Sequence, residues 1–491
     1  MVLLYTIIQK FNKYYLLNSS SLERFGIHMD NRSVIMNQHT NLLELEEHIY
    51  HLEDVENPNT FRNLFPYDEV PKIAFNNRIV PHNMPEHIWI TDTTFRHGQQ
   101  SRAPYTTEQI VTIYDYLHRL SGPNGIVRAS EFFLYTKKDR DAVYKCLERG
   151  YQFPEVTSWI RANRKDFQLV KDIGLKETGI LVSCSDYHIF YKMKMTRQQA
   201  MFHYLHIVRE CLEFGISPRC HLEDITRSDL FGFVIPFCLE LMRLQDQYKI
   251  PVKIRACDTM GYGVNFSGAV MPRAVQGIIY GLTTHAGVPS ENLEWHGHND
   301  FYKAVTNSTT AWLYGCSGVN TSLFGIGERT GNTPLEAMVF EYAQLKGTLD
   351  GMDTTVITDL AEYFEKEIGE KIPERTPFVG KNFNVTRAGI HADGLLKNQE
   401  IYNIFDTEKF LKRPPLVAVS NTSGLAGIAH WINNYYRLDE EHKVDKNSDL
   451  VVKLKNWVDE QYEDGRVTVV SDEELVAAID LYCQELRIVL K

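Results

Sequence analysis

The chain has 491 residues, of which 43% are hydrophobic and 23% charged, a composition typical of a soluble globular protein with two or three domains. Its formal net charge of -11, without any basic cluster, argues against a nucleic-acid-binding surface. The eight cysteines are scattered without a C-x-x-C pair, which predicts free thiols in a reducing compartment instead of a disulfide scaffold or a zinc ribbon.

Residues 1–85 are expected to form an N-terminal extension and an arm. The first residues, MVLLYTIIQKFNKYYLL, are apolar but lack the charged region and cleavage site of a signal peptide, and Lys10 and Lys13 interrupt them well short of a membrane span. We therefore expect a cytoplasmic protein, with Met29 and Met36 as alternative starts. Apolar residues at helical spacing over 41–55 predict an amphipathic helix, and the Pro- and Asn-rich residues 56–85 predict an extended arm.

Residues 86–350 alternate between apolar strand-like runs and helical patterns. The clearest helical pattern begins at Thr196 and stops at Gly215. Eight strands alternating with eight helices fit a (β/α)8 TIM barrel better than an open doubly wound sheet. The predicted strands cover 87–92, 126–135, 153–159, 178–185, 218–223, 252–258, 292–298 and 318–324.

Residues 351–491 lose this alternation. Helical patterns cover 423–435 and 448–462, and a last one begins at Asp472. We therefore predict a smaller, mainly helical C-terminal domain that follows the barrel.

His296 and His298 stand two residues apart at the end of the seventh predicted strand. On an extended strand this spacing puts both imidazoles on one face, where they can share a metal ion. Paired histidines are common, and most of them bind no metal. Their position strengthens the metal hypothesis, because barrels of this type keep their chemistry at the carboxyl ends of the strands.

Other polar residues follow predicted strand ends and are expected around the same mouth of the barrel. For each of them alone, a solvated loop residue or a helix cap is the simpler interpretation. Polar residues that follow several strand ends at once are harder to explain as unrelated loop residues. The residues are Arg96 and His97, Glu223 and Asp224, Asp258 and Thr259, and the segment GERTGN at 327–332.

Four motifs in this order resemble the Claisen-condensing branch of the DRE-TIM metallolyases, the family of 2-isopropylmalate, citramalate and homocitrate synthases. They are DTTFRHGQQ at 92–100, HGHND at 296–300, GIGERTGNTPLE at 325–336, and AGIHADGLLKN at 388–398 with Tyr402. Together they cover roughly residues 87–410. Within the branch, SEFFLY at 130–135, WIRAN at 159–163 and DTMGYGV at 258–264 are most similar to the Re-citrate synthases.

The resemblance implies a metal site. The family's two histidine ligands match His296 and His298, and its asparagine ligand matches Asn332. The fourth family ligand is an aspartate, where this sequence has His97. A His/His/His/Asn set without an anionic ligand weakens Mg²⁺ and favours Mn²⁺, our first expectation, or Co²⁺, Fe²⁺ or Zn²⁺. The metal site of this chain is therefore expected either to prefer a different metal from that of the family or to bind metal poorly.

The resemblance also implies roles for the remaining residues in a condensation of acetyl-CoA with a 2-oxo acid. Arg96 stabilises the alkoxide that develops on the keto oxygen, and His391 with Tyr402 removes the methyl proton of acetyl-CoA. As in the family, the C-terminal domain is expected to cross to the partner's barrel in a homodimer. Glu223 and Thr259 match substrate-holding positions; Glu223 also enters the catalytic set.

Donors near other strand ends could hold the substrate's second carboxylate. The candidate donors are Arg161, Ser183, Ser185 and His188, which are compatible with oxaloacetate without deciding for it. Glu328 is a further candidate for substrate binding. The leading hypothesis is synthesis of citrate from oxaloacetate and acetyl-CoA, with homocitrate or 2-isopropylmalate synthesis as sister hypotheses.

Two hypotheses belong to other classes. A lyase like the HMG-CoA lyases would carry a cysteine in the loop after the eighth strand, where this chain has GIGERTGN. A barrel that binds without catalysis is supported only by His97.

Overall fold

The computed structural model describes residues 34–36, 43–45, 50–76, 78–161, 163–439 and 441–486. The chain divides into two compact units, Met1–Met352 and Asp353–Lys491. None of the described helices is long and apolar enough to cross a membrane.

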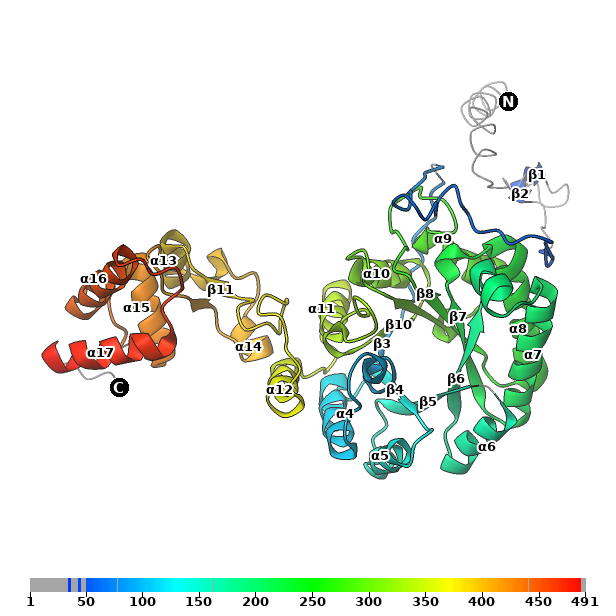
Figure 1. Ribbon diagram of the computed structural model, residues 1–491, viewed down its shortest axis with the longest axis horizontal. Helices are drawn as coiled ribbons and strands as arrows, with labels where there is room; N and C mark the ends of the chain where they lie inside the picture. The colour runs from blue at the N-terminus through cyan, green and yellow to red at the C-terminus, as the bar shows by residue number, and fades with distance from the viewer. Residues whose placement is uncertain are drawn as a thin grey trace, which may run out of the picture. The chain divides into compact units, whose positions relative to one another are not determined.

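The first unit is built around a closed barrel of eight parallel strands, surrounded by helices α4 to α11 (Figure 1). The predicted TIM barrel is confirmed, since each strand pairs with its sequence neighbours and β10 pairs with β3 to close the ring. The strands are β3 (Trp89–Asp92), β4 (Val127–Phe133), β5 (Glu155–Ile160), β6 (Glu177–Ser183), β7 (Ser217–Glu223), β8 (Lys253–Asp258), β9 (Leu293–Gly297) and β10 (Gly318–Thr321).

The helices of the barrel follow its strands. Three of them begin with a capping box, in which the hydroxyl of Thr106, Thr136 or Thr196 accepts a hydrogen bond from the backbone three residues on. The helix after β8 follows the long loop 259–274; its six α-helical residues continue directly into a π-helical turn, η5 (Gly281–His285). The helices are α4 (Thr107–Ser121), α5 (Lys137–Glu148), α6 (Arg164–Ile173), α7 (Arg197–Glu213), α8 (Ile235–Tyr248), α9 (Val275–Tyr280), α10 (Ala304–Tyr314) and α11 (Leu335–Lys346).

Residues 50–76 form an arm that runs over the barrel without regular structure. Its backbone bonds to barrel loops, from Glu53 N to Gly232 O at 2.8 Å and from Val270 N to Ala74 O at 3.0 Å. The helix predicted over 41–55 is wrong where the structure describes it: Leu43–Leu45 is strand β2, which pairs with β1 (Val34–Met36), and residues 50–55 are not helical. Hydrogen bonds to the barrel replace those of a helix. The rest of that prediction, and the apolar first 33 residues, lie outside the described residues.

The second unit is mainly helical, as predicted. Its core packs α15 (Gly424–Tyr435) with α16 (Asp449–Glu463) and α17 (Asp472–Leu486), around Ile428, Leu454 and Ile479. The remaining elements are α12 (Val356–Tyr363), β11 (Val385–Thr386), α13 (Gly389–Lys397), α14 (Thr407–Leu411) and β12 (Leu416–Val417).

All eight cysteines are unpaired, and seven of them are buried. The predicted absence of a disulfide framework is therefore confirmed. Burial raises the pKa of the Cys220 and Cys146 thiols to about 12, so these side chains behave as small apolar groups.

Candidate active site

Arg96 and His97 lie in a tight π-helical turn, η1 (Thr94–Gly98), directly after β3. Asp92, the last residue of β3, shapes this turn by accepting hydrogen bonds from Thr94 N at 3.0 Å and Thr94 Oγ1 at 2.5 Å. Ser130 Oγ on β4 donates to its other oxygen at 2.6 Å. Burial outweighs these bonds and raises the pKa of Asp92 to about 6. The turn is therefore fixed from within the barrel.

Three imidazoles meet at the mouth. The ring centroid of His97 lies 4.7 Å from that of His296 and 6.3 Å from that of His298, and the last two centroids are 5.1 Å apart. Burial and the neighbouring positive charges lower the pKa of all three rings, to about 4 for His298 and well below the usual value for the others. All three are therefore neutral at pH 7, the form in which imidazole binds metals.

Asn320 on β10 sets the tautomer of His296. The amide oxygen of Asn320 lies 2.8 Å from Nδ1 of His296, while its Nδ2 donates to Thr91 Oγ1 at 2.9 Å. Since an amide oxygen can only accept, Nδ1 of His296 carries the proton. This assignment leaves Nε2 of His296 with a free lone pair.

The loop after β10 brings Asn332 beside these rings, where it forms an isolated antiparallel bridge with His298. Two acceptor-capable atoms here are buried without a partner among the described residues, Oδ1 of Asn332 and Nδ1 of His298. Buried polar atoms without partners are rare, and they mark where a missing partner binds. Together with Nε2 of His296 they fit a divalent metal ion.

His97 is less well placed for this role. Its Nε2 contacts the guanidinium of Arg96, and its Nδ1 lies 3.3 Å from Nδ2 of Asn332. Within the described residues, no group of three or more His, Cys, Asp or Glu side chains is placed to hold a metal ion. His97 would become a ligand only by releasing one of its nitrogens from these contacts.

Arg96 is almost fully buried, and its guanidinium lies 4.7 Å from the ring centroid of Trp159. Desolvation lowers the pKa of Arg96 to about 10, which still leaves it charged at pH 7. Nε of Arg96 and Nε1 of Trp159 are buried donors that have no hydrogen-bond partner in the described part of the chain. Both donors are therefore available to oxygen atoms of a ligand at the mouth.

A row of ion pairs runs from Arg96 down the inside of the barrel. Arg96 NH1 lies 3.5 Å from Glu131, Glu131 pairs with Arg255 at 3.2 Å, and Arg255 pairs with Glu294 at 2.8 Å. Although burial opposes it, Arg219 and Arg255 lower the pKa of Glu294 to about 2, so the carboxylate stays ionised. The row continues to the other end of the barrel through Arg219, Glu177 and Lys253.

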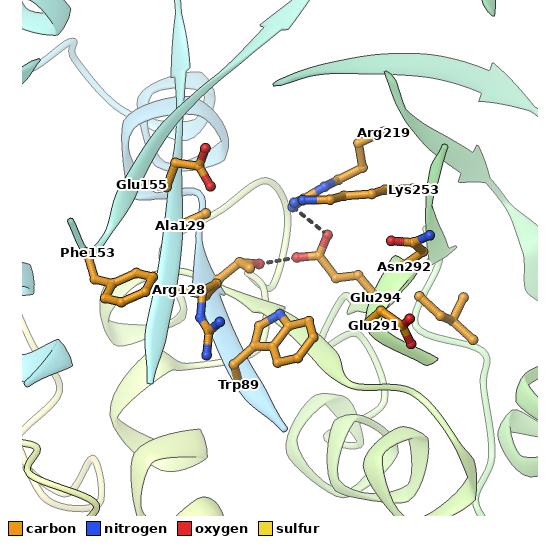
Figure 2. A pocket seen from close by; sticks show the side chains of 12 residues that line it. Trp89, Arg128, Ala129, Phe153, Glu155, Arg219, Lys253, Glu291, Asn292 and Glu294 are labelled. Atoms are coloured by element: carbon orange, nitrogen blue, oxygen red, sulfur yellow. Dashed lines mark hydrogen bonds and ion pairs between the residues drawn. The ribbon is translucent and has the colours of Figure 1, made fainter. Parts of the chain in front are cut away.

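Figure 2 shows the lower end of this row, where Arg219 and Glu294 face a cavity of about 290 Å³ at the amino ends of the strands. The row contains four cations and three carboxylates, and Glu155 and Glu291 line the cavity beside Lys253, which is 29% exposed there. The cations at the lower end therefore have carboxylates and solvent near them. At the upper end, the free Nε of the buried Arg96 can bind an anionic ligand.

Glu223 and Thr259 lie at the carboxyl ends of β7 and β8. Glu223 is held by Ser183 Oγ, by His188 Nδ1 at 2.9 Å and by Lys192 Nζ at 3.4 Å. Despite partial burial, these partners lower the pKa of Glu223 to about 2. Thr259 Oγ1 accepts a hydrogen bond from Asp224 N at 2.8 Å. Both side chains are thus held in fixed positions near the mouth.

The other predicted substrate-binding residues are placed differently. Ser185 Oγ donates to the buried Asp224 at 2.5 Å. Arg161 is 66% exposed and pairs with Asp166 at 3.5 Å, so the structure does not bring it to the other site residues. Glu328 is exposed, and its backbone bonds to His298.

His391 and Tyr402 come together within the second unit, with ring centroids 4.5 Å apart and both side chains exposed. His391 lies on α13, and Tyr402 follows a 3₁₀ turn at Gln399–Ile401. Gly394 makes room for the tyrosine, because a Cβ there would lie 2.5 Å from the ring. The pair is therefore a preformed acid–base candidate on the surface of its unit.

The sequence reasoning missed Glu131, Arg255, Glu294, Trp159 and Asn320, which position Arg96 and His296. Glu131, Arg255 and Glu294 are charged residues in the middle of otherwise buried strands. Such residues are rarely buried unless paired, so that position was the signal that could have found them.

Comparison with known proteins gives a family and close relatives. The sequence model of the HMGL-like family matches residues 87–363. A protein of Clostridium kluyveri named Citrate (Re)-synthase is 63% identical over 426 residues, which cover 87% of this chain and 94% of that protein. One of the same name from Syntrophus aciditrophicus is 54% identical over 455 residues, 93% of this chain and 72% of that protein. The 2-phosphinomethylmalate synthase of Streptomyces hygroscopicus is 36% identical over 436 residues, 87% of this chain and 97% of that protein.

Proposed function

The chain belongs to the HMGL-like family, and on this premise we propose that it is an acyltransferase that condenses acetyl-CoA with oxaloacetate to give citrate and free CoA. Two relatives that share more than half of the aligned residues carry the name Citrate (Re)-synthase, which assigns attack to the re face of the keto group. The observation that carries the proposal is the buried Arg96, whose Nε has no partner among the described residues, beside three neutral imidazoles, because a guanidinium suits an anionic oxo acid.

A divalent metal belongs to the chemistry of this family, and the unpartnered atoms of His298 and Asn332 fit such an ion. When bound, it polarises the keto group of the substrate. We propose that His296, His298 and Asn332 hold it and that it is Mn²⁺, because imidazole and amide ligands without a carboxylate suit Mn²⁺ better than Mg²⁺.

The chain's own residues supply the remaining steps. The free Nε of Arg96 donates to the oxygen that becomes the alkoxide, and Nε1 of Trp159 is a second donor for a carboxylate of oxaloacetate. A ring nitrogen of His391 takes the methyl proton of acetyl-CoA, with the hydroxyl of Tyr402 beside it. A carbon–carbon bond forms between that methyl carbon and the keto carbon, and water then cleaves the thioester and releases CoA.

We propose further that the enzyme is a homodimer in which His391 and Tyr402 serve the barrel of the partner. His391 and Tyr402 are both exposed on a unit that is separate from the barrel, which is consistent with a role toward a second chain. The oligomeric state and the origin of the acid–base pair are tested together below.

The function is tested by release of free CoA from acetyl-CoA with a panel of oxaloacetate, 2-oxoglutarate, pyruvate and 2-oxoisovalerate. Oxaloacetate should give the highest kcat/KM. Citrate made from labelled acetyl-CoA and then split by a citrate lyase of si specificity should keep its label in oxaloacetate. A preference for 2-oxoisovalerate would indicate an isopropylmalate synthase. If none of the four oxo acids supports release of CoA, the proposed condensing activity is contradicted.

A further inference from the structure

We propose that a cavity of about 530 Å³ beside the barrel mouth binds the adenosine 3′-phosphate 5′-diphosphate end of CoA. The proposal rests on the condensing function and adds to it the place where the nucleotide lies. The cavity is lined by Arg62, Tyr67, Tyr187, Tyr191, Arg227 and Tyr262, among others. Its volume lies within the range of small-molecule sites, which is about 300–1,000 Å³.

One wall of the cavity comes from the arm 50–76. The arm is held there by two bonds to the loop after β6, from Asn59 N to Asp186 Oδ2 at 2.7 Å and from the hydroxyl of Tyr187 to the carbonyl of Thr60 at 2.8 Å. Leu64 and Phe65 pack with Val270 in a small apolar cluster. The wall is therefore fixed against the barrel before any ligand arrives, which lowers the entropic cost of binding.

The charged residues that line the cavity are Arg62, Arg227 and Glu69, and Glu69 pairs with Lys72 at 3.2 Å. Arg62 has no carboxylate partner within the described part of the chain, and its guanidinium lies 5.9 Å from the ring centroid of Tyr187. Arg227 lies 4.1 Å from the same ring and is held in place by Asp224. Two guanidinium groups around one tyrosine, of which only one has an acidic partner, form a site for phosphate groups.

The aromatic lining suits an adenine base. Tyr67 is 93% exposed and has a φ of +78°, a backbone conformation that a tyrosine adopts only when the surrounding chain imposes it. Tyr191 on the opposite wall is 51% exposed. An exposed aromatic ring binds a base by stacking, worth about 1–3 kcal/mol per base in nucleic-acid complexes. Tyr67 therefore offers an exposed stacking surface, and Tyr191, which packs edge-on against Tyr187 with ring centroids 6.3 Å apart, offers a partly exposed one.

The cavity connects to the metal-binding loop through the segment after β8. Tyr262 lines the cavity and lies 5.3 Å, centroid to centroid, from Phe301. Its neighbour Gly261 packs so closely on the HGHND loop that a Cβ there would lie 3.0 Å from the carbonyl oxygen of His298. A CoA anchored in the cavity can therefore extend its pantetheine arm toward the mouth.

The test compares acetyl-CoA with acetyl-pantetheine, which has the same reacting group but no nucleotide. In Arg62→Gln, the kcat/KM for acetyl-CoA divided by that for acetyl-pantetheine should fall about tenfold, since a charge-assisted contact to phosphate is lost. Arg243→Gln is the matched control. Arg243 is an exposed arginine on α8 that pairs with Glu240 outside the cavity, so this substitution should leave the ratio unchanged.

An unchanged ratio in Arg62→Gln, or an equal loss with both thioesters, would overturn the proposal. Failure of the condensing function is a separate result, seen when the wild-type protein releases no CoA with any oxo acid. In that case calorimetric titration with adenosine 3′,5′-bisphosphate decides. Binding that is about tenfold weaker in Arg62→Gln than in Arg243→Gln supports the site, whereas equal or absent binding overturns it.

Discussion

At the scale of single residues, His97 differs from a carboxylate in charge and in the contacts that it allows. An imidazole accepts one hydrogen bond from the guanidinium of Arg96 and, unlike a carboxylate, brings no negative charge to it. Because the histidine is neutral, the negative charge beside Arg96 at this position comes from the substrate. This role differs from that of the aspartate expected from the family resemblance.

We expect His97→Asp to shift the metal preference of the enzyme toward Mg²⁺. The new carboxylate adds the hard oxygen ligand that Mg²⁺ prefers and also neutralises Arg96. The measurement is kcat/KM with Mn²⁺, Co²⁺ and Mg²⁺, together with metal affinity by calorimetry. His97→Asn, which adds no charge, is the control. An unchanged metal profile in His97→Asp would show that position 97 does not contact the ion.

Glu336 gives a prediction on pH and stability. It is buried on α11, accepts a hydrogen bond from Phe324 N at 3.0 Å, and burial raises its pKa to about 7 from a usual 4.5. At a pH between these two pKa values, the carboxyl group of Glu336 is ionised in the unfolded chain but still protonated in the folded chain. The contribution of Glu336 to stability therefore falls as pH rises from 4.5 to 7 and is lost above 7.

Glu336→Gln removes this titration and keeps an oxygen that can accept from Phe324. The free energy of unfolding of the variant minus that of the wild type should increase across this window, by up to about 3 kcal/mol at pH 8. Denaturant titrations at pH 5, 6, 7 and 8 measure it. A difference that stays constant with pH would mean that Glu336 is ionised throughout in the folded protein.

At the scale of elements, the loop after β10 depends on a close backbone approach. Gly331, directly before Asn332, has a φ of +89°, and a Cβ there would lie 2.1 Å from the carbonyl oxygen of Gly325. Only glycine allows this approach, and the approach in turn fixes Asn332 beside the histidines.

Gly331→Ala should therefore lower metal affinity and kcat by at least about tenfold, because a clash with the backbone displaces the loop. Gly347→Ala is the matched control. Gly347 has a similar φ of +70° but open space around its Cβ position, so this change costs only backbone strain. Equal effects of the two substitutions on metal affinity would contradict a special role for the loop.

The barrel could be predicted from the sequence because eight strand-like runs alternate with helical patterns, and polar residues follow where several of the strands end. His296, His298 and Asn332 were found in the same way, with the family motifs. The charged residues inside the barrel could not be placed, since their partners are tens of residues away, as for Glu131 and Arg255. Residues 56–85 were expected to form an extended arm, but the hydrogen bonds that hold residues 50–76 on barrel loops leave no mark in the sequence of that segment.

At the scale of the whole molecule, the candidate residues are divided between two compact units. Arg96 and the histidines belong to the first, and His391 with Tyr402 to the second. In a dimer whose second units serve the partner barrels, every active site takes residues from both chains.

Mixing inactive variants tests this arrangement. Arg96→Ala and His391→Ala should each lose nearly all turnover. Random heterodimers formed by co-expression contain one intact site each, so the mixture should recover about a quarter of the wild-type activity. Activity is measured by CoA release, and dimerisation by analytical ultracentrifugation. No recovery from mixed dimers would mean that each chain completes its own site.

The row of alternating charges inside the barrel also limits how this protein can change over evolutionary time. Each member between the two ends of the row pairs with two neighbours, so the loss of one leaves an unpaired charge that costs several kcal/mol. Viable sequences should therefore replace Arg255 and Glu294, or Arg219 and Glu177, as couples and seldom singly. In a collection of related sequences, these interior positions would covary in opposite sign even though none of them needs to touch the substrate.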